Sequence, residues 1–143
     1  MLTFQEELWH QFLPDALPLW ERHYEELCQD KARMPMGPDL DMYGALESIG
    51  ILQLVTARDS AGRLAGYQIS IIRPHLHYSS VVCQFEDTYF LDKPYRKGLA
   101  GVHLIKFSIE RAKQRGAKKS FYQSIESKPT DKIWKWLGFK KTH

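Results

Sequence analysis

The sequence predicts an α/β fold of the α+β kind, in which a mixed but mostly antiparallel sheet is flanked by helices. Three β-rich runs, 51–58, 64–73 and 81–91, are joined by connections too short for a parallel crossover, so we expect an antiparallel meander. The third run then leads through a glycine-bearing turn into an amphipathic helix and another strand. Residues 81–125 therefore form one βαβ unit, whose last strand lies parallel to or splayed from the run 81–91.

Length and composition fit one compact domain. The 143 residues contain no repeat and no linker, so we expect residues 1–143 to form a single domain. A formal charge of +3 is too small for the basic stripe of a nucleic-acid binder, which argues against a nucleic-acid partner. No apolar run reaches the roughly 18 residues of a membrane span, and residues 1–10 do not resemble a signal peptide. We therefore expect a cytoplasmic protein with no membrane partner.

Two helices are expected before the sheet. Asp15 is a good N-cap for the first, with Pro18 in its first turn. Asp39 caps the second, shorter helix, and Gly50 ends it. The apolar residues at helical spacing, which we expect to face inward, are Leu17, Trp20, Tyr24, Leu27 and Cys28 in the first helix and Met42, Leu46 and Ile49 in the second.

The C-terminal third is expected to alternate between helix and strand. An amphipathic helix runs from Val102 to Gly116, a strand covers 121–125, and a short helix follows Thr130. Gly138 and Phe139 begin a stub of a final strand, after which few residues remain. An exposed sheet edge at this stub would favour a homodimer.

The most informative stretch for function is the turn at residues 94–101. A long strand enters a tight loop that bears glycines and cationic side chains, and the loop opens a helix. The first N–H groups of a helix have no partner within it and lie at the positive end of its dipole, where a diphosphate binds well. Gly98 and Gly101 let the backbone approach such a ligand, and Arg96 and Lys97 add positive charge.

At this point the sequence resembles the GNAT superfamily of N-acetyltransferases, in particular its small phage and bacterial members. Three segments carry the resemblance: Gly66-Tyr67 in a strand, the stretch from Leu91 to Gly101, and Leu137-Gly138-Phe139 near the end. Their order and spacing match the third strand, the fourth strand with its coenzyme A loop, and the Leu-Gly-Phe after the last helix. The resemblance covers roughly residues 40–141.

The resemblance implies that acetyl-CoA binds in a cleft where the strand 118–125 splays from the strand 81–91. The pantetheine would pair with the backbone, and the phosphates would rest on the loop. The residues implied are Phe90, Leu91 and Asp92 for the pantetheine and Arg96, Lys97, Gly98, Leu99, Ala100 and Gly101 for the phosphates.

Two positions depart from the family pattern. The family loop reads Gln/Arg-x-x-Gly-x-Gly/Ala, and its central glycine falls on Leu99 here, one place after Gly98. Many members also have a tyrosine that protonates the leaving thiolate, four residues before the glycine of Gly-Phe. Trp134 stands there, and an indole cannot act as a general acid, so solvent, Tyr122 or no group supplies the proton.

Candidate catalytic groups lie on the strand before the loop. The resemblance implies that a carboxylate here removes the amine proton, and Glu86 and Asp87 are adjacent. Neighbouring strand residues point to opposite faces, so only one of the two can face the cleft. Counting back from the loop as in family members favours Asp87, with Glu86 second. Either could instead be a solvated or paired strand residue.

Two histidines and a tyrosine are candidates on the acceptor side. His75 and His77 follow Pro74 in a turn, and Tyr122 lies on the later strand. The histidines either order the hairpin through hydrogen bonds or contact the acceptor. No partner carboxylate or thiol completes a metal site with them, and neither Cys28 nor Cys83 belongs to a C-x-x-C pair, so we expect no metal.

The sequence thus leads to an N-acetyltransferase that transfers acetyl from acetyl-CoA to an amine by direct attack in a ternary complex. The acceptor is open: a protein lysine, an N-terminus, a polyamine, an antibiotic and an aminoacyl group all remain. The alternatives are a CoA-binding module without catalysis and a protein-interaction domain that does not bind CoA.

Overall fold

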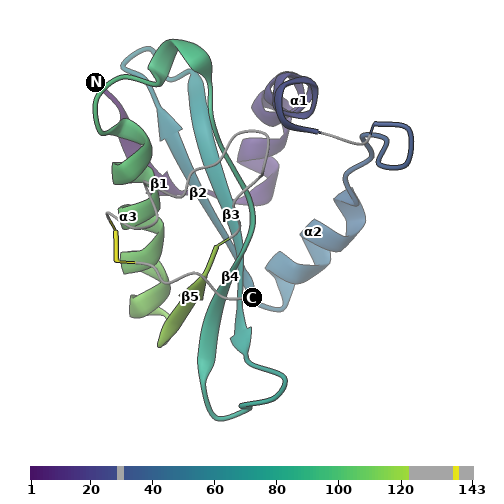
Figure 1. The fold of residues 1–143 in the computed structure, drawn as a ribbon, viewed down its shortest axis with the longest axis vertical. Coiled ribbons are helices and arrows are strands. Elements are labelled where there is room, and N and C mark those ends of the chain that lie inside the picture. The colour runs from purple at the N-terminus through teal and green to yellow at the C-terminus, as the bar shows by residue number, and fades with distance from the viewer. Residues whose placement is uncertain (29–30, 123–136, 139–143) are drawn as a thin grey trace.

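A five-stranded sheet forms the centre of the molecule (Figure 1). The computed structural model describes residues 1–28, 31–122 and 137–138. The strand order is β1-β2-β3-β4-β5; β4 and β5 are parallel, and all other neighbours are antiparallel. This confirms the predicted mixed sheet. The strands are β1 (Thr3–Glu6), β2 (Leu52–Arg58), β3 (Leu64–Pro74), β4 (Val82–Leu91) and β5 (Lys119–Phe121).

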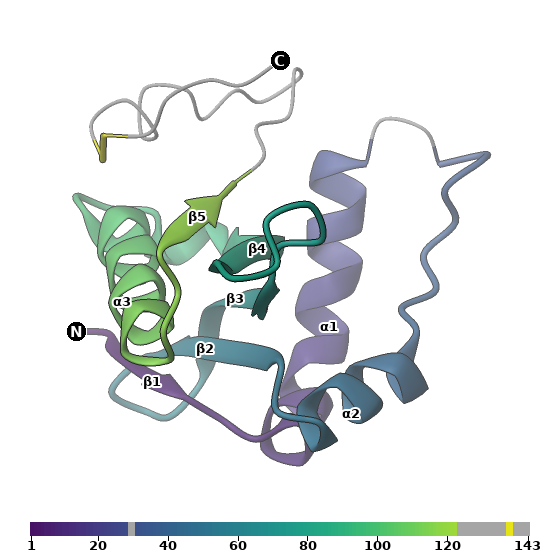
Figure 2. The ribbon, with the colours of Figure 1, turned by 90° about the horizontal axis from the view of Figure 1, so that it is seen from below.

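Helices cover both faces of the sheet (Figure 2). The helices α1 (Trp9–Leu27) and α2 (Leu40–Ser48) lie on one face, and α3 (Ala100–Gln114) lies on the other. One apolar cluster therefore joins α1 to the sheet, and others join α3 to it. Because both faces are covered, most of β2 and β3 is buried, including the polar residues Gln53 and Gln68.

The first helix begins earlier than the sequence indicates. It starts at Trp9, where the side chain of Gln11 accepts a hydrogen bond from the N–H of Leu8 at 3.0 Å, so Asp15 is not its N-cap. Asp15 instead pairs with a β2 arginine at 2.9 Å. The buried face matches the expected one only in part: Trp20 is buried as expected, whereas Leu17 is 45% exposed. The buried side chains are Trp9, Phe12, Ala16, Leu19 and Trp20.

The strand β1 was not expected from the sequence. It pairs antiparallel with β2, from Thr3 opposite Arg58 to Glu6 opposite Val55. Four residues are too few to show a period of two, and the packing of Phe4 against the α3 side becomes visible only in three dimensions.

The second helix confirms its predicted cap and part of its predicted inner face. Asp39 accepts a hydrogen bond from the N–H of Met42 at 3.0 Å. Leu46 packs against the α1 cluster as expected, together with Tyr43, three residues before it on the face toward the sheet. Met42 and Ile49 are 53% and 69% exposed, so the expectation that they face inward is wrong.

The last described strand also begins earlier than expected. β5 starts at Lys119 rather than at residue 121, and it pairs with β4 from Cys83 to Phe85. Three expected features lie outside the described residues: the helix after Thr130, the position of Trp134 and most of the final stub. The homodimer stays a prediction.

Gly66 is the place where β3 and β4 approach each other most closely. A Cβ added there would lie 2.6 Å from the carbonyl oxygen of Phe90 and 3.0 Å from the Cα of Leu91, both of them backbone atoms. We predict that Gly66→Ala lowers the free energy of unfolding by about 1–3 kcal/mol, because the strands must shift. Urea unfolding measures this.

Gly44→Ala is the matched control for this substitution. Nothing lies within 4 Å of a Cβ at Gly44, which is inside α2. Alanine should therefore stabilise the protein there by about 0.5–1 kcal/mol. A Gly66→Ala protein that unfolds at the same urea concentration as the wild type would contradict the packing described here.

Candidate active site

The described pairing between β4 and β5 is short. It ends at Phe85, whereas β4 continues to Leu91, and the residues from 123 to 136 lie outside the described part of the chain. Residues 86–91 pair with β3 on one edge and have no partner strand on the other among the described residues. The splayed cleft expected between these two strands stays a prediction.

The loop after β4 leads into α3, and several backbone N–H groups of the loop and of the first turn of the helix are unpaired among the described residues. Gly98 has a φ of +59°, in the left-handed region. At this end of the helix, the N–H of Ala100 makes a long bond of 3.4 Å to the carbonyl of Lys97, and the N–H of His103 bonds the carbonyl of Leu99 at 2.9 Å. Within the described part of the chain, the N–H groups of Gly98, Leu99, Gly101 and Val102 have no hydrogen-bond acceptor. They form a site suited to an anion, as predicted for this turn.

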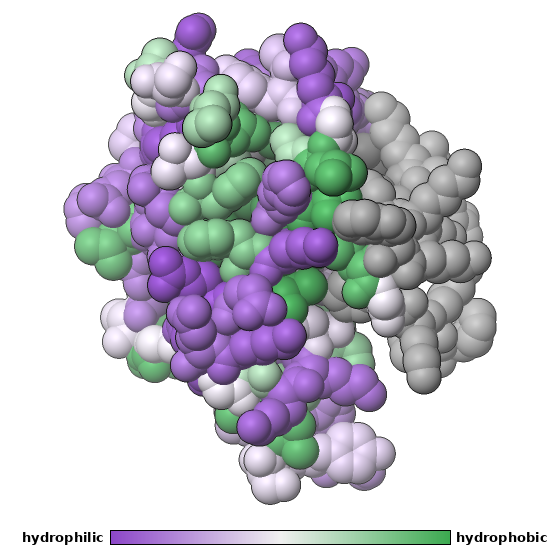
Figure 3. Space-filling model, turned by 90° about the vertical axis from the view of Figure 1, so that its left-hand side faces the viewer, coloured by the Kyte–Doolittle hydropathy of each residue, from purple (hydrophilic) through white to green (hydrophobic). Residues whose placement is uncertain are grey.

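A concave surface lies between the N-terminal residues and the loop. This cavity of about 460 Å³ is lined by Met1, Leu2 and Phe4 on one side and by loop and helix residues that include Leu99 and His103 on the other. Figure 3 shows that apolar side chains gather on this side of the molecule and are bordered by hydrophilic ones. A Cβ at Gly101 would lie 2.7 Å from the hydroxyl of Tyr89, so glycine leaves room for that side chain at the start of the helix.

Arg96 is directed away from the unpaired N–H groups. Its guanidinium donates to both carboxylate oxygens of Glu26 on α1, at 3.1 and 2.6 Å, and its Nε donates to the carbonyl of Leu91 at 2.5 Å. The N–H of Asp92 donates to the carbonyl of Ala65 at 2.8 Å. Two backbone groups expected to meet a pantetheine are therefore already bonded within the protein.

Glu86 and Asp87 lie on opposite faces of β4, as predicted. Asp87 is exposed on the side of α2, where Tyr43 donates its hydroxyl proton to Oδ2 at 2.5 Å. Glu86 lies opposite Ser70 and faces α3. Burial raises the pKa of Glu86 to about 7, and the charge of Asp87 adds to the rise.

A buried polar cluster holds Tyr122 beside Glu86. The Tyr122 oxygen accepts hydrogen bonds from the side-chain amides of Gln68 and of Gln84, the second at 3.3 Å. Gln84 also donates to the hydroxyl of Ser70 at 3.0 Å. Burial raises the pKa of Tyr122 well above its usual range, so the phenol keeps its proton at neutral pH.

The fold matches solved acetyltransferases along its whole length. An acetyltransferase from Trypanosoma brucei matches with a TM-score of 0.75 at 17% identity, covering 100% of this chain and 95% of that one. A ribosomal-protein-alanine N-acetyltransferase from Brucella melitensis matches at 0.74 and 15% identity, covering 100% and 94%. A Clostridium acetobutylicum acetyltransferase solved with acetyl-CoA matches at 0.73 and 10% identity, covering 99% and 92%.

The chain has the GNAT fold. No family model matches the sequence, and a search of curated proteins found no match either. At these identities the similarity establishes the GNAT fold and leaves the activity to be argued from the site.

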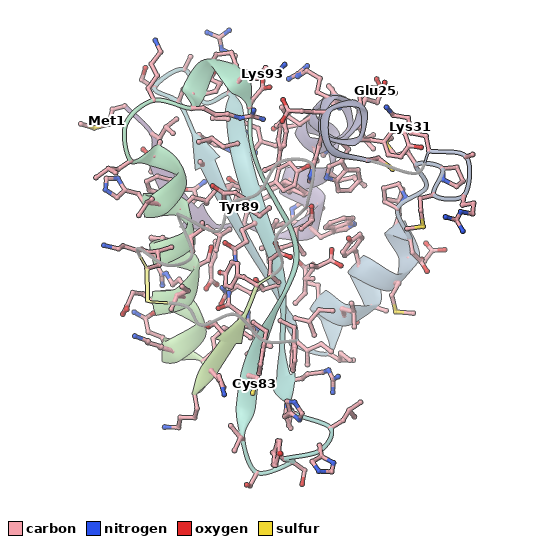
Figure 4. All side chains as sticks on the ribbon, in the orientation of Figure 1. Met1, Glu25, Lys31, Cys83, Tyr89 and Lys93 are labelled. Atoms are coloured by element: carbon pink, nitrogen blue, oxygen red, sulfur yellow. The ribbon has the colours of Figure 1, made fainter. Side chains whose placement is uncertain are left out.

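Within this GNAT fold, the two predicted histidines lie far from the loop. Figure 4 shows the β3–β4 turn, near Cys83, at the opposite end of the sheet from Lys93. The Nδ1 of His75 accepts hydrogen bonds from the N–H groups of His77 and Tyr78, at 3.1 and 3.3 Å. His75 therefore orders the hairpin; contact of either histidine with an acceptor stays a prediction.

Several residues of the site were missed by sequence reasoning. Tyr43, the partner of Asp87, was not considered, and the pairing of Arg96 with Glu26 was not foreseen. The buried glutamines beside Tyr122 gave a weak signal, since each is a polar residue within a β-rich run. No group of three or more metal-ligating side chains gathers in the described residues, and no described helix is long and apolar enough to cross a membrane.

The pKa of Glu86 provides a test of this geometry that does not depend on activity. We predict that Glu86 titrates near pH 7 and that Asp87→Asn lowers its pKa, because the neighbouring negative charge that disfavours ionisation is removed. Carboxyl carbon shifts in a pH titration by NMR measure both values. Glu110→Gln, an exposed change on α3, is the control and should leave Glu86 unchanged. An unchanged Glu86 pKa in Asp87→Asn would contradict the coupling.

Proposed function

We propose that the protein transfers an acetyl group from acetyl-CoA to an amine by direct attack of the amine on the thioester. The observation that carries the proposal is the set of N–H groups at residues 98, 99, 101 and 102 that have no acceptor among the described residues, in the loop and helix start that follow the end of β4. A diphosphate satisfies these donors at the positive end of α3, and the rest of the donor follows the open edge of β4 toward Glu86 and Asp87.

The phosphate subsite uses mainly the backbone. Gly98, Leu99, Ala100 and Gly101 line it, and Lys97 contributes charge. The leucine at the central glycine position of the family pattern does not obstruct this, because Gly98 adopts the left-handed conformation one residue earlier. Phe90, Leu91 and Asp92 border the pantetheine. The pantetheine forms hydrogen bonds with the backbone N–H and C=O groups of this edge that are not already bonded within the protein.

The acceptor approaches Asp87 from the side of α1 and α2. Asp87 is exposed there and held by Tyr43, so it can receive the ammonium form of the amine. The amine loses a proton to a carboxylate and attacks the carbonyl carbon, and the carbon–sulfur bond then breaks. Asp87 is the first candidate for the base, and Glu86 is the second, with a pKa of about 7 that suits proton transfer near neutral pH.

The leaving thiolate takes its proton from Tyr122. Two amide groups donate to the oxygen of Tyr122, so its own O–H serves as a donor, and burial keeps it protonated. We place the reaction in the cytoplasm, in keeping with the free cysteines Cys28 and Cys83. The chemical class of amine is not defined by these residues.

A transfer assay separates the proposal from its alternatives. The protein is titrated with acetyl-CoA by calorimetry and then incubated with labelled acetyl-CoA and a panel of peptides, polyamines and aminoglycosides. We expect saturable binding and release of CoA with at least one amine. Saturable binding without CoA release from any amine would favour a CoA-binding module, and no binding at millimolar acetyl-CoA would favour an interaction domain.

Tyr122→Phe tests the general acid. It removes the O–H while keeping the ring, and we predict that kcat falls about a hundredfold with the KM for acetyl-CoA little changed, because a positioned acid acts in the transition state. Tyr78→Phe, an exposed tyrosine at the far hairpin, is the control. Wild-type kcat in Tyr122→Phe would exclude the role.

A further inference from the structure

The C-terminal half of α1 contacts the segment that enters the anion site at several points. Arg22 pairs with Asp92 at 3.0 Å, and the ring of His23 stacks on Phe90 with centroids 4.6 Å apart. Glu26, one turn after Arg22, pairs with Arg96. Glu26 is four residues after Arg22 and three after His23, so it neighbours both on the surface of the helix, and this part of α1 holds the end of β4 and the loop that follows it.

The Glu26–Arg96 pair is the most highly connected of these contacts. Two guanidinium nitrogens donate to the two oxygens of Glu26, in the bidentate geometry that fixes both position and orientation. A third donor, Nε, reaches the carbonyl of Leu91, and the guanidinium lies over the ring of Phe90 at 5.3 Å. The Glu26 side chain is only 10% exposed, and its Oε1 also forms an ion pair with Nζ of Lys93 at 3.6 Å.

This arrangement makes it difficult for Arg96 to act on a phosphate as a mobile cation. Reaching the unpaired N–H groups would break the bidentate pair, release the Leu91 carbonyl and deprive a largely buried carboxylate of its bidentate partner. A charge deprived of its partner in such a position is strongly unfavourable. Lys97 can supply charge to the site without any such rearrangement, because no ion pair holds it among the described residues.

We propose that Glu26 is a positioning residue for the donor site: through Arg96 it fixes the Leu91 carbonyl and the start of the anion-binding loop. Arg96 accordingly contributes to acetyl-CoA binding through the geometry of the backbone and not by contact with the diphosphate. This inference rests on the proposed function and adds to it a residue of α1 that lies outside the cofactor loop.

Removing the negative charge of Glu26 distinguishes positioning from charge. If only electrostatics mattered, Glu26→Gln would strengthen binding of the anionic acetyl-CoA, because a nearby carboxylate is lost and Arg96 is released. If Glu26 positions the loop, the same substitution weakens binding, on the order of tenfold, because the N–H groups are no longer held in place. The two accounts predict opposite signs.

The experiment measures acetyl-CoA dissociation constants by calorimetry, with thermal unfolding as a check on folding. Glu25→Gln is the matched control: the same charge is removed from the adjacent residue of α1, whose side chain is 72% exposed and pairs only loosely with Lys31 at 3.6 Å. It should bind acetyl-CoA as the wild type does or slightly more tightly. Arg96→Lys keeps the charge but loses the bidentate geometry, and it should weaken binding as much as Glu26→Gln.

A double variant completes the test. In the Arg96→Gln background, Glu26→Gln should have no further effect on binding, because the two residues act as one unit. Glu26→Gln binding as tightly as the wild type or more tightly, or Arg96→Lys retaining full affinity, would overturn the inference. Failure of the wild type itself to bind acetyl-CoA would instead reject the proposed function, so the two failures are distinguishable.

Discussion

Backbone hydrogen bonding is the constraint on which the site depends. Buried N–H and C=O groups must find partners, and the antiparallel ladders of β1 to β4 provide them. A parallel neighbour for β4 can be reached only through a crossover helix, and here β5 meets β4 at one end of the strand. Among the described residues, the other end of β4 has no partner strand on this edge, and the crossover helix begins beside it with four N–H groups, at 98, 99, 101 and 102, that have no acceptor. The crossover from β4 to β5 thus produces both parts of the candidate donor site: the edge of β4 and the N–H groups at the start of α3.

How well the sequence predicted each element follows from how local its signal is. The strands β2, β3 and β4 and the start of α3 were predicted closely, because turn residues and periodicity lie within the elements themselves. The turn with its N–H groups that lack acceptors among the described residues was predicted for the same reason, since Gly98 and the helix start are neighbours in sequence; anion binding there stays a prediction. The start of α1 was not predicted correctly, because Pro14 and Pro18 suggest an interruption of the helix. Only the burial of Trp9 and Phe12 against the sheet shows that the helix begins before these prolines.

The residues missed in the site share one property: their partners are distant in sequence. Tyr43 and Asp87 are 44 positions apart, and Arg96 and Glu26 are 70 apart. Each looks like an ordinary surface residue until the helices pack on the sheet. The cationic side chain of Arg96 suggested phosphate binding when it was considered alone, whereas its contacts with α1 indicate a positioning role.

A β-bulge explains why the two carboxylates differ so strongly. Ile69 lies opposite Thr88 and Ser70 lies opposite Glu86, so Asp87 is the extra residue of β4. In a regular strand, residues three apart point to opposite faces.

The extra residue places Glu86 and Tyr89, opposite Ser70 and Gln68, on the α3 face, where each is shielded from water. It leaves Asp87 exposed to Tyr43 on the other face. Side-chain alternation read from the sequence correctly separates the neighbours Glu86 and Asp87. Alternation cannot tell which of the two shares a face with a given residue near the loop. The extra residue at the bulge reverses the face to which every earlier residue of β4 points, relative to the residues that follow it. The bulge thus places a half-buried carboxyl with a pKa near neutrality and an exposed carboxylate within one peptide unit of each other, and the proposed proton transfer uses this difference in environment.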